Sequence, residues 1–141
     1  MQLQQRNKYL ETTIQTASPA QLLIMLFDGA IRFCKQGIES IQSNNYADAN
    51  TNLLKVQNIV KEFMITVDRS SPLSEGLLGV YEYMNKRLIE ANIKKEVEPA
   101  QEVLDQLIEL KETWVQAARQ SNQQAGQANG NVLKPNHSVV V

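Results

Sequence analysis

The chain of 141 residues has little of the chemistry that enzymes use, with one cysteine, Cys34, and one histidine, His137. A single cysteine excludes an internal disulfide, and a single histidine cannot supply the paired Glu-x-x-His ligands of a di-iron helical bundle. Cys34 lies among apolar residues with no histidine nearby in the pattern, so we expect it to pack rather than to react. No glycine-rich phosphate loop follows a strand. We therefore predict a non-enzymatic protein with no metal, no cofactor and no small-molecule substrate.

Charge imbalance, signal segments and long apolar runs are also missing. The net charge of -1 argues against binding to nucleic acid or to acidic membranes. Asp28, Arg32 and Lys35 interrupt the most apolar stretch, which excludes a membrane-spanning helix. The first 15 residues have no apolar signal core, so we expect a cytoplasmic protein. The four prolines, six glycines and absence of alternating β-branched runs favour an all-α fold.

The most distinct stretch of the sequence is residues 16–33. Ser18 is a good N-cap, Pro19 suits the first helical position, and Gln21 can complete a capping box with Ser18. Behind this start, apolar residues fall on three lines around the helix, a distribution typical of a helix surrounded by others. We expect a helix from Pro19 to about residue 43, at the centre of a bundle.

Three further helices follow from the apolar spacing. The second is expected over about 46–68, with Asn45 as its N-cap. The third, capped by Ser71 or Ser74, ends near residue 95, and the fourth covers about 99–122. Residues spaced by three and four predict their buried sides: Leu53, Val56, Val60, Phe63 and Val67 on the second helix, and Leu77, Tyr81, Met84, Leu88 and Ala91 on the third.

Short connections between helices of similar length predict an antiparallel up-down-up-down four-helix bundle over residues 18–122. Residues 1–17 are polar with a few apolar points, Tyr9, Leu10 and Ile14. They are either a frayed leader or an N-terminal strap that covers a groove on the bundle, and we adopt the strap. Residues 123–141 are rich in Gln, Asn and Gly and are expected to be a disordered tail.

Two other residues carry structural expectations. Asp28 interrupts the apolar first helix, and we expect it to pair with a basic residue across helices, such as Lys55 or Arg87. Trp114 is expected in the core of the fourth helix, with its indole N–H near the edge.

The second and third helices carry apolar residues that their buried sides do not need. Single exposed apolar residues are common and need no explanation. Large exposed patches are rare, however, and usually mark interaction sites. We therefore predict a groove that accepts amphipathic helices of a partner, formed by Leu54, Ile65, Leu78, Ile89 and Ile93, with Asn50 and Asn58 on the same side.

Four patches of the sequence, in the same order, resemble the FliS-type flagellin export chaperones. The first patch resembles the pattern T-A-S-P-x-x-L-x-x-M-L-Y-D-G-A-I of that family, with Phe27 in place of the usual tyrosine. The resemblance covers about residues 9–118 and leaves the tail outside. Its patches are Thr16–Phe33, Ala49–Val60, Leu78–Asn92 and Glu102–Ala117.

The resemblance implies a cytoplasmic four-helix chaperone that binds the disordered C-terminal segment of flagellin. Binding would prevent premature polymerisation and keep flagellin competent for type III export. The resemblance also implies that the stretch near the N-terminus gives way to the client. A protein of the flagellar export gate is a second candidate partner. The alternative function is a structural helical-bundle adaptor that self-associates through the same apolar residues.

Overall fold

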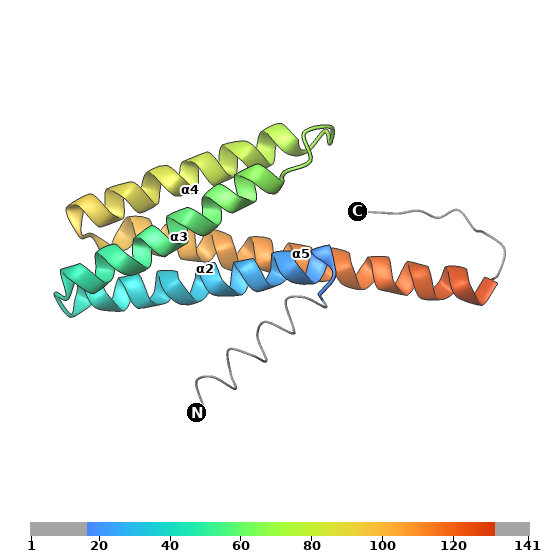
Figure 1. Cartoon of the computed structure of the whole chain (residues 1–141), viewed down its shortest axis with the longest axis horizontal. Helices are drawn as coiled ribbons and strands as arrows, with labels where there is room; N and C mark the ends of the chain where they lie inside the picture. The colour runs from blue at the N-terminus through green and yellow to red at the C-terminus, as the bar shows by residue number, and fades with distance from the viewer. Residues whose placement is uncertain (1–16, 132–141) are drawn as a thin grey trace, which may run out of the picture. The chain divides into compact units, whose positions relative to one another are not determined.

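The computed structural model describes residues 17–131, which form four helices and no strand. The predicted all-α class is confirmed (Figure 1). These residues divide into a main unit, residues 26–109, and a terminal unit, residues 17–25 and 110–131. The helices are α2 (Pro19–Gln42), α3 (Tyr46–Thr66), α4 (Ser74–Lys94) and α5 (Val97–Asn131).

Two of the predicted helix starts are confirmed in detail. The backbone N–H of Ser18 donates to Gln21 Oε1 at 2.9 Å, and the backbone N–H of Gln21 donates to Ser18 Oγ at 3.2 Å, which is a complete capping box. Asn45 Oδ1 accepts from the backbone N–H of Asp48 at 3.3 Å. Local sequence is therefore enough to fix where α2 and α3 begin.

The start of α4 differs from the prediction that Ser71 or Ser74 is its N-cap. Leu73 is the N-cap and makes no capping hydrogen bond with its side chain. Ser71 Oγ accepts from the backbone N–H of Leu73 at 3.1 Å, so it stabilises the preceding turn instead. Ser74 is already helical and buried. Because both serines are suitable N-cap residues, the sequence alone did not identify the first residue of α4.

The ends of the helices also differ from expectation. α3 ends at Thr66 because Val67 adopts an extended conformation, with ψ 129°. α5 begins at Val97 and continues to Asn131, beyond the expected end at about residue 122. The segment expected to be a disordered tail is thus helical as far as Asn131.

The connections at one end of the main unit are tight turns. Residues 43–45 join α2 to α3, and residues 95–96 join α4 to α5. Each turn contains a non-glycine residue in the left-handed region, Asn44 with φ 59° and Lys95 with φ 52°. The N–H of Lys95 caps α4 by donating to the Ala91 carbonyl. Such short turns make each pair of helices antiparallel neighbours.

The interior of the main unit is built from one side of each helix. The Phe27 and Phe63 rings stack with centroids 4.4 Å apart, and Tyr81 follows at 5.3 Å from Phe63. Gly37 is buried because α3 approaches closely there; a Cβ at Gly37 would lie 2.9 Å from Leu53 Cδ2. Cys34 donates its S–H to the Ala100 carbonyl of α5 at 3.4 Å. Each helix therefore contacts its two neighbours around one core.

The expectation that α2 is buried around most of its circumference is wrong. Its buried residues lie on one stripe: Phe27, Ala30, Cys34, Gly37, Ile38 and Ile41. Leu26, Ile31 and Phe33, also in the main unit, are only half-buried. In a four-helix bundle each helix has two neighbours, so no helix is central and one broad side remains open to solvent.

The terminal unit contains the start of α2 and the later part of α5. Among the described residues 17–25 and 110–121, every apolar side chain is half-buried or exposed and none is fully buried. Trp114 is half-buried there, which matches a position at the edge more than one in a core. In the described part of the chain, no helix has the length and apolar character needed to span a membrane.

Candidate functional site on the outer face of α3 and α4

The apolar residues predicted to form a partner site differ in exposure from the core residues beside them. Ile65 and Ile93 are 74% and 77% exposed, and Leu54 and Ile89 are 44% and 39% exposed. Leu78 is half-buried. By contrast, Leu53 and Leu88, one position before Leu54 and Ile89, are completely buried. α3 and α4 therefore each have an apolar outer stripe in addition to their buried stripe.

Two hydrogen bonds fix how the outer stripes lie relative to each other. Asn92 Nδ2 on α4 donates to Asn50 Oδ1 on α3 at 2.8 Å. Seven residues further along α3, Gln57 Nε2 donates to Asn85 Oδ1 at 3.3 Å, and Asn85 lies seven residues before Asn92. The helices thus run antiparallel in one constant register.

This register places the predicted residues in facing pairs. By this register Leu54 lies within one residue of the level of Ile89, and Ile65 within one residue of the level of Leu78. We call the outer surface shared by the two helices the α3–α4 groove. From its helical spacing and register we assign to it Asn50, Leu54, Asn58, Lys61, Met64 and Ile65 of α3 and Leu78, Glu82, Asn85, Lys86, Ile89 and Ile93 of α4.

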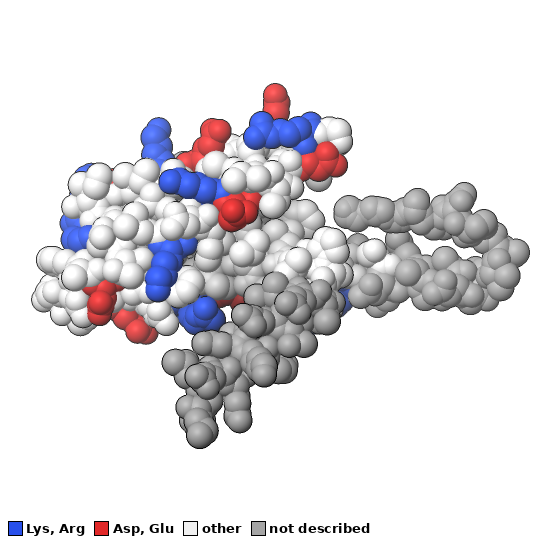
Figure 2. Space-filling view, in the orientation of Figure 1, with Lys and Arg blue, Asp and Glu red and all other residues white. Residues whose placement is uncertain are grey.

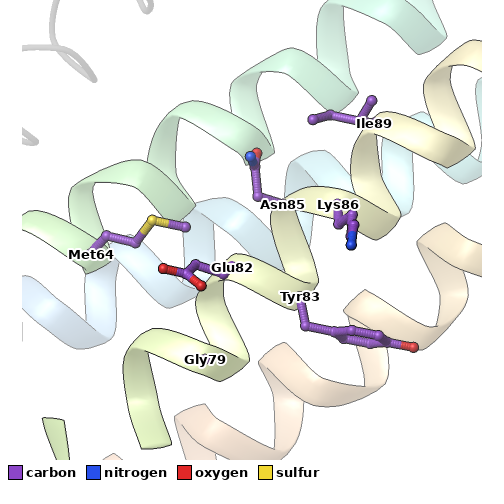
Figure 3. Close-up of a pocket in the computed structure, with 7 residues that line it drawn as sticks. All are labelled: Met64, Gly79, Glu82, Tyr83, Asn85, Lys86 and Ile89. Carbon is purple, nitrogen blue, oxygen red and sulfur yellow. The ribbon is translucent and has the colours of Figure 1, made fainter. Parts of the chain in front are cut away.

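Part of the groove is a hollow of about 550 Å³ that is open to solvent. Figure 3 shows Met64 reaching from α3 toward Glu82 on α4, while Tyr83 extends toward α5. Gly79 is exposed where it lines the hollow, and a Cβ there would meet nothing within 4 Å. The hollow is lined by Met64, Gly79, Glu82, Tyr83, Asn85, Lys86 and Ile89.

Asn50 and Asn58, the polar residues predicted for the site, have different roles in the structure. Asn50 is exposed and is bonded to Asn92, so it holds the end of the groove together. Asn58 is exposed on the outer side of α3. Whether either residue binds a partner stays a prediction.

An ionic cluster joins α4 to α5 beside the hollow. Arg87 Nη2 lies 2.9 Å from Glu102 Oε2, and Arg87 Nη1 lies 2.7 Å from Glu90 Oε2. The Tyr83 hydroxyl donates to Glu102 Oε1. The hydrogen bond from Tyr83, with a further one from Arg87, lowers the pKa of Glu102, and the same Tyr83 bond raises the pKa of the tyrosine. The pKa of Glu90 is also lowered, chiefly by Arg87. These contacts hold Tyr83 at the border of the hollow.

Of the residues that line the hollow, the sequence predicted Ile89 alone and missed Met64, Gly79, Glu82, Tyr83, Asn85 and Lys86. Tyr83 and Leu73 are exposed at 42% and 70%, and Met64 lines the hollow. An exposed aromatic residue beside an apolar helical stripe is a signal that could have marked Tyr83. Leu73 lies just before α4, where no helical spacing applies.

Charged side chains on the face of the molecule seen in Figure 2 are scattered between broad uncharged areas. No single-sign patch of the kind that binds nucleic acid covers that face. Among the residues that the structure describes, no group of three or more His, Cys, Asp or Glu could hold a metal ion.

The other sequence candidates behave as structural residues. Cys34 is buried, and burial raises the pKa of its thiol to about 12, with a smaller contribution from Asp105. Such a thiol is not a nucleophile at neutral pH. Arg87, one of the proposed partners of Asp28, pairs with Glu90 and Glu102. Lys55 Nζ lies 4.9 Å from the centre of the Phe33 ring. The predicted strap residues Tyr9, Leu10 and Ile14 lie outside the described residues.

Comparison with known proteins identifies a family that the chain resembles. The family model described as flagellar protein FliS matches residues 2–121. The flagellar secretion chaperone FliS of Bacillus subtilis strain 168 is 33% identical over 109 residues, which cover 77% of this chain and 82% of that protein. The flagellar secretion chaperone FliS of Escherichia coli K12 is 30% identical over 108 residues, covering 74% and 79%.

A solved structure supports the fold independently. The protein titled "Crystal structure of flagellar chaperone from bacteria" superposes with a TM-score of 0.68, covering 85% of this chain and 99% of that one. Its sequence identity is 18%, so it supports the helical-bundle fold alone. The predicted bundle is thereby confirmed.

Proposed function

Because this chain belongs to the FliS family of flagellar secretion chaperones, we propose that it binds the C-terminal segment of flagellin in the cytoplasm. Binding prevents premature polymerisation and keeps flagellin competent for flagellar type III export. The family consists of chaperones and not enzymes, in agreement with the prediction from the sequence. What the chain does in flagellar secretion therefore depends on a surface rather than on catalysis.

The observation that carries this proposal is the α3–α4 groove. Leu54, Ile65, Ile89 and Ile93 remain exposed although the same helices bury complete core stripes. Apolar side chains at helical spacing on both walls of a shallow groove suit an amphipathic helix. A disordered segment loses entropy when it folds on binding, so it must bury a large surface, typically ~1,000–3,000 Å². Extended stripes supply such a surface without a deep pocket.

Isothermal titration calorimetry with a peptide of the last ~40 residues of flagellin from the same organism tests the proposal. Coupled folding and burial give a large negative heat-capacity change. We expect one-to-one binding with that signature. If the peptide does not bind, or binds with no heat-capacity change, the proposal is wrong.

The N-terminal strap and the export-gate protein remain parts of this proposal. If residues 1–15 cover the groove, their deletion removes a competitor and tightens peptide binding. Unchanged or weaker binding after the deletion contradicts a covering role. An export-gate protein would be expected to bind the loaded chaperone, and a pull-down with and without the flagellin peptide compares the two states.

A further inference from the structure

We propose that the α3–α4 groove accepts one amphipathic helix of the client, with two apolar contact residues eleven positions apart and a carboxylate-bearing residue between them. The carboxylate lies against Lys61 and Lys86. This inference rests on the proposed function, and it specifies which part of a client the groove selects.

The apolar surface of the groove is divided into two ends. At one end Leu54 faces Ile89, with Ile93 one turn further along α4. At the other end Ile65 faces Leu78, with Met64 in the adjoining hollow. Leu54 and Ile65 are eleven residues apart, which is about 16 Å along a helix and close to three full turns. A client helix lying alongside α3 repeats this spacing with residues eleven positions apart on one side.

The middle of the groove is polar and has more hydrogen-bond donors than acceptors. It contains Lys61 on α3, opposite Glu82 on α4, and Lys86 one turn beyond Glu82. The ion pairs found on α4 join Arg87 to Glu90 and Glu102, and Lys94 to Glu90; among the described residues, none joins Lys61 or Lys86 to Glu82. Asn85 already accepts a hydrogen bond from Gln57 through its carbonyl. The middle of the groove therefore carries two lysines and one glutamate, with no ion pair between them.

A helix placed across this middle region removes water from the lysines. A charge that loses water without gaining a partner is unfavourable, whereas an opposite charge at hydrogen-bond distance compensates for the loss. A carboxylate between the two apolar contacts supplies that partner, and a lysine there adds a third positive charge. A helix with the same apolar spacing but a basic residue at the centre therefore binds more weakly. This difference allows the groove to select its client.

Charge reversal tests the inference. The Lys86→Glu variant is titrated with the C-terminal flagellin peptide and with the same peptide carrying lysine in place of the enclosed acidic residue. We expect Lys86→Glu to weaken binding of the natural peptide about tenfold or more at low salt, and the reversed peptide to recover most of the loss. Lys35→Glu, the same charge change at an exposed position of α2, is the matched control and should leave both affinities unchanged.

The outcomes separate this inference from the proposed function. A peptide that does not bind the unmodified chain contradicts the proposed function and the inference together. Tight binding that Lys86→Glu leaves unchanged, or a loss that the reversed peptide does not recover, contradicts the inference alone. A flagellin C-terminal segment that binds but has no acidic residue between apolar residues eleven positions apart also contradicts it. Thermal melting of Lys86→Glu shows whether the variant is folded, and recovery by the reversed peptide cannot come from a change in folding.

Discussion

Gly79 lies in a regular helical stretch of α4, where glycine is about 1 kcal/mol less favourable than alanine. Its backbone does not need glycine, because its φ is negative and a Cβ there would meet nothing within 4 Å. Gly76, three residues earlier, is equally open, but it does not line the hollow. The pair therefore allows folding and binding to be examined separately.

We predict that Gly79→Ala raises the free energy of unfolding by about 0.5–1 kcal/mol and weakens binding of the flagellin peptide. The added methyl group stabilises the helix but keeps a partner helix away from the backbone of α4 at this position. Urea denaturation and calorimetry measure the two effects. Gly76→Ala is the control, with the same gain in stability and unchanged binding. Equal affinities of the two variants would show that no partner approaches Gly79 closely.

The raised pKa of Cys34 predicts how stability changes in alkali. The unfolded thiol ionises near pH 9 and the folded one near pH 12, so between these values the unfolded state releases a proton that the folded state keeps. The free energy of unfolding then falls by up to ~1.4 kcal/mol per pH unit above pH 9, and is unaffected below it. Urea denaturation between pH 8 and pH 10.5, which covers roughly the lower half of the interval between the two pKa values, measures how the free energy of unfolding changes with pH. Cys34→Ala should lose this slope while other groups still titrate, and an identical slope in the variant would contradict the prediction.

At the scale of the helix, α3 and α4 differ from α5 in having two apolar stripes. Leu53 and Leu88 are completely buried, whereas their neighbours Leu54 and Ile89 are exposed. A buried leucine changed to alanine costs about 2–5 kcal/mol, while exposed changes usually stay within ±0.5 kcal/mol. Mutations on the two stripes should therefore affect different properties.

We predict that the double variant Ile65→Asp/Ile89→Asp binds the flagellin peptide at least about tenfold more weakly, because carboxylates replace both apolar walls. Its melting temperature should stay close to that of the unmodified chain. Leu53→Ala is the matched comparison, with lower melting temperature and, where folded, unchanged affinity. If Ile65→Asp/Ile89→Asp unfolds, its residues belong to the core.

The cluster between α4 and α5 predicts a response to acid. Hydrogen bonds from Tyr83 and Arg87 lower the pKa of Glu102 in the folded state, so the carboxylate contributes stability above its unfolded pKa, near 4.5. That contribution is lost as pH falls through the lower folded pKa. Glu102→Gln should therefore show a smaller decrease in urea midpoint between pH 6 and pH 3, about 1.5 pH units either side of 4.5. Glu39→Gln, at an exposed position of α2, is the control and should behave as the unmodified chain does.

At the scale of the whole molecule, the sequence predicted the interior better than the boundaries. Leu53, Val56, Val60 and Phe63 are all buried, because residues spaced by three and four must share one side of a helix. Val67 was grouped with them, yet α3 ends before it. Helix ends depend on turns whose geometry tertiary contacts decide.

The candidate groove was predictable only in part. Angular position on each helix separated Ile65 and Ile89 from the core, since a residue far from the buried stripe has no neighbour to cover it. The pairing of Leu54 with Ile89 needed the hydrogen bonds of Asn50 and Gln57 across the helices. The Tyr83–Glu102 bond likewise depends on how α4 and α5 align, which no pattern within one helix contains.

The oligomeric state distinguishes the proposed chaperone from the self-associating adaptor. Sedimentation velocity over a wide concentration range should give a monomer that becomes a one-to-one complex when flagellin peptide is added, because the groove then has one occupant. A stable dimer that does not respond to the peptide would favour the adaptor.

The two separate stripes on α3 and α4 also have an evolutionary consequence. A side chain such as Ile93, which is 77% exposed, can be replaced without a compensating change at Leu88 or Phe63. If the sequence of the bound client changes during evolution, the exposed residues of α3 and α4 can therefore change with it while the buried core residues stay the same.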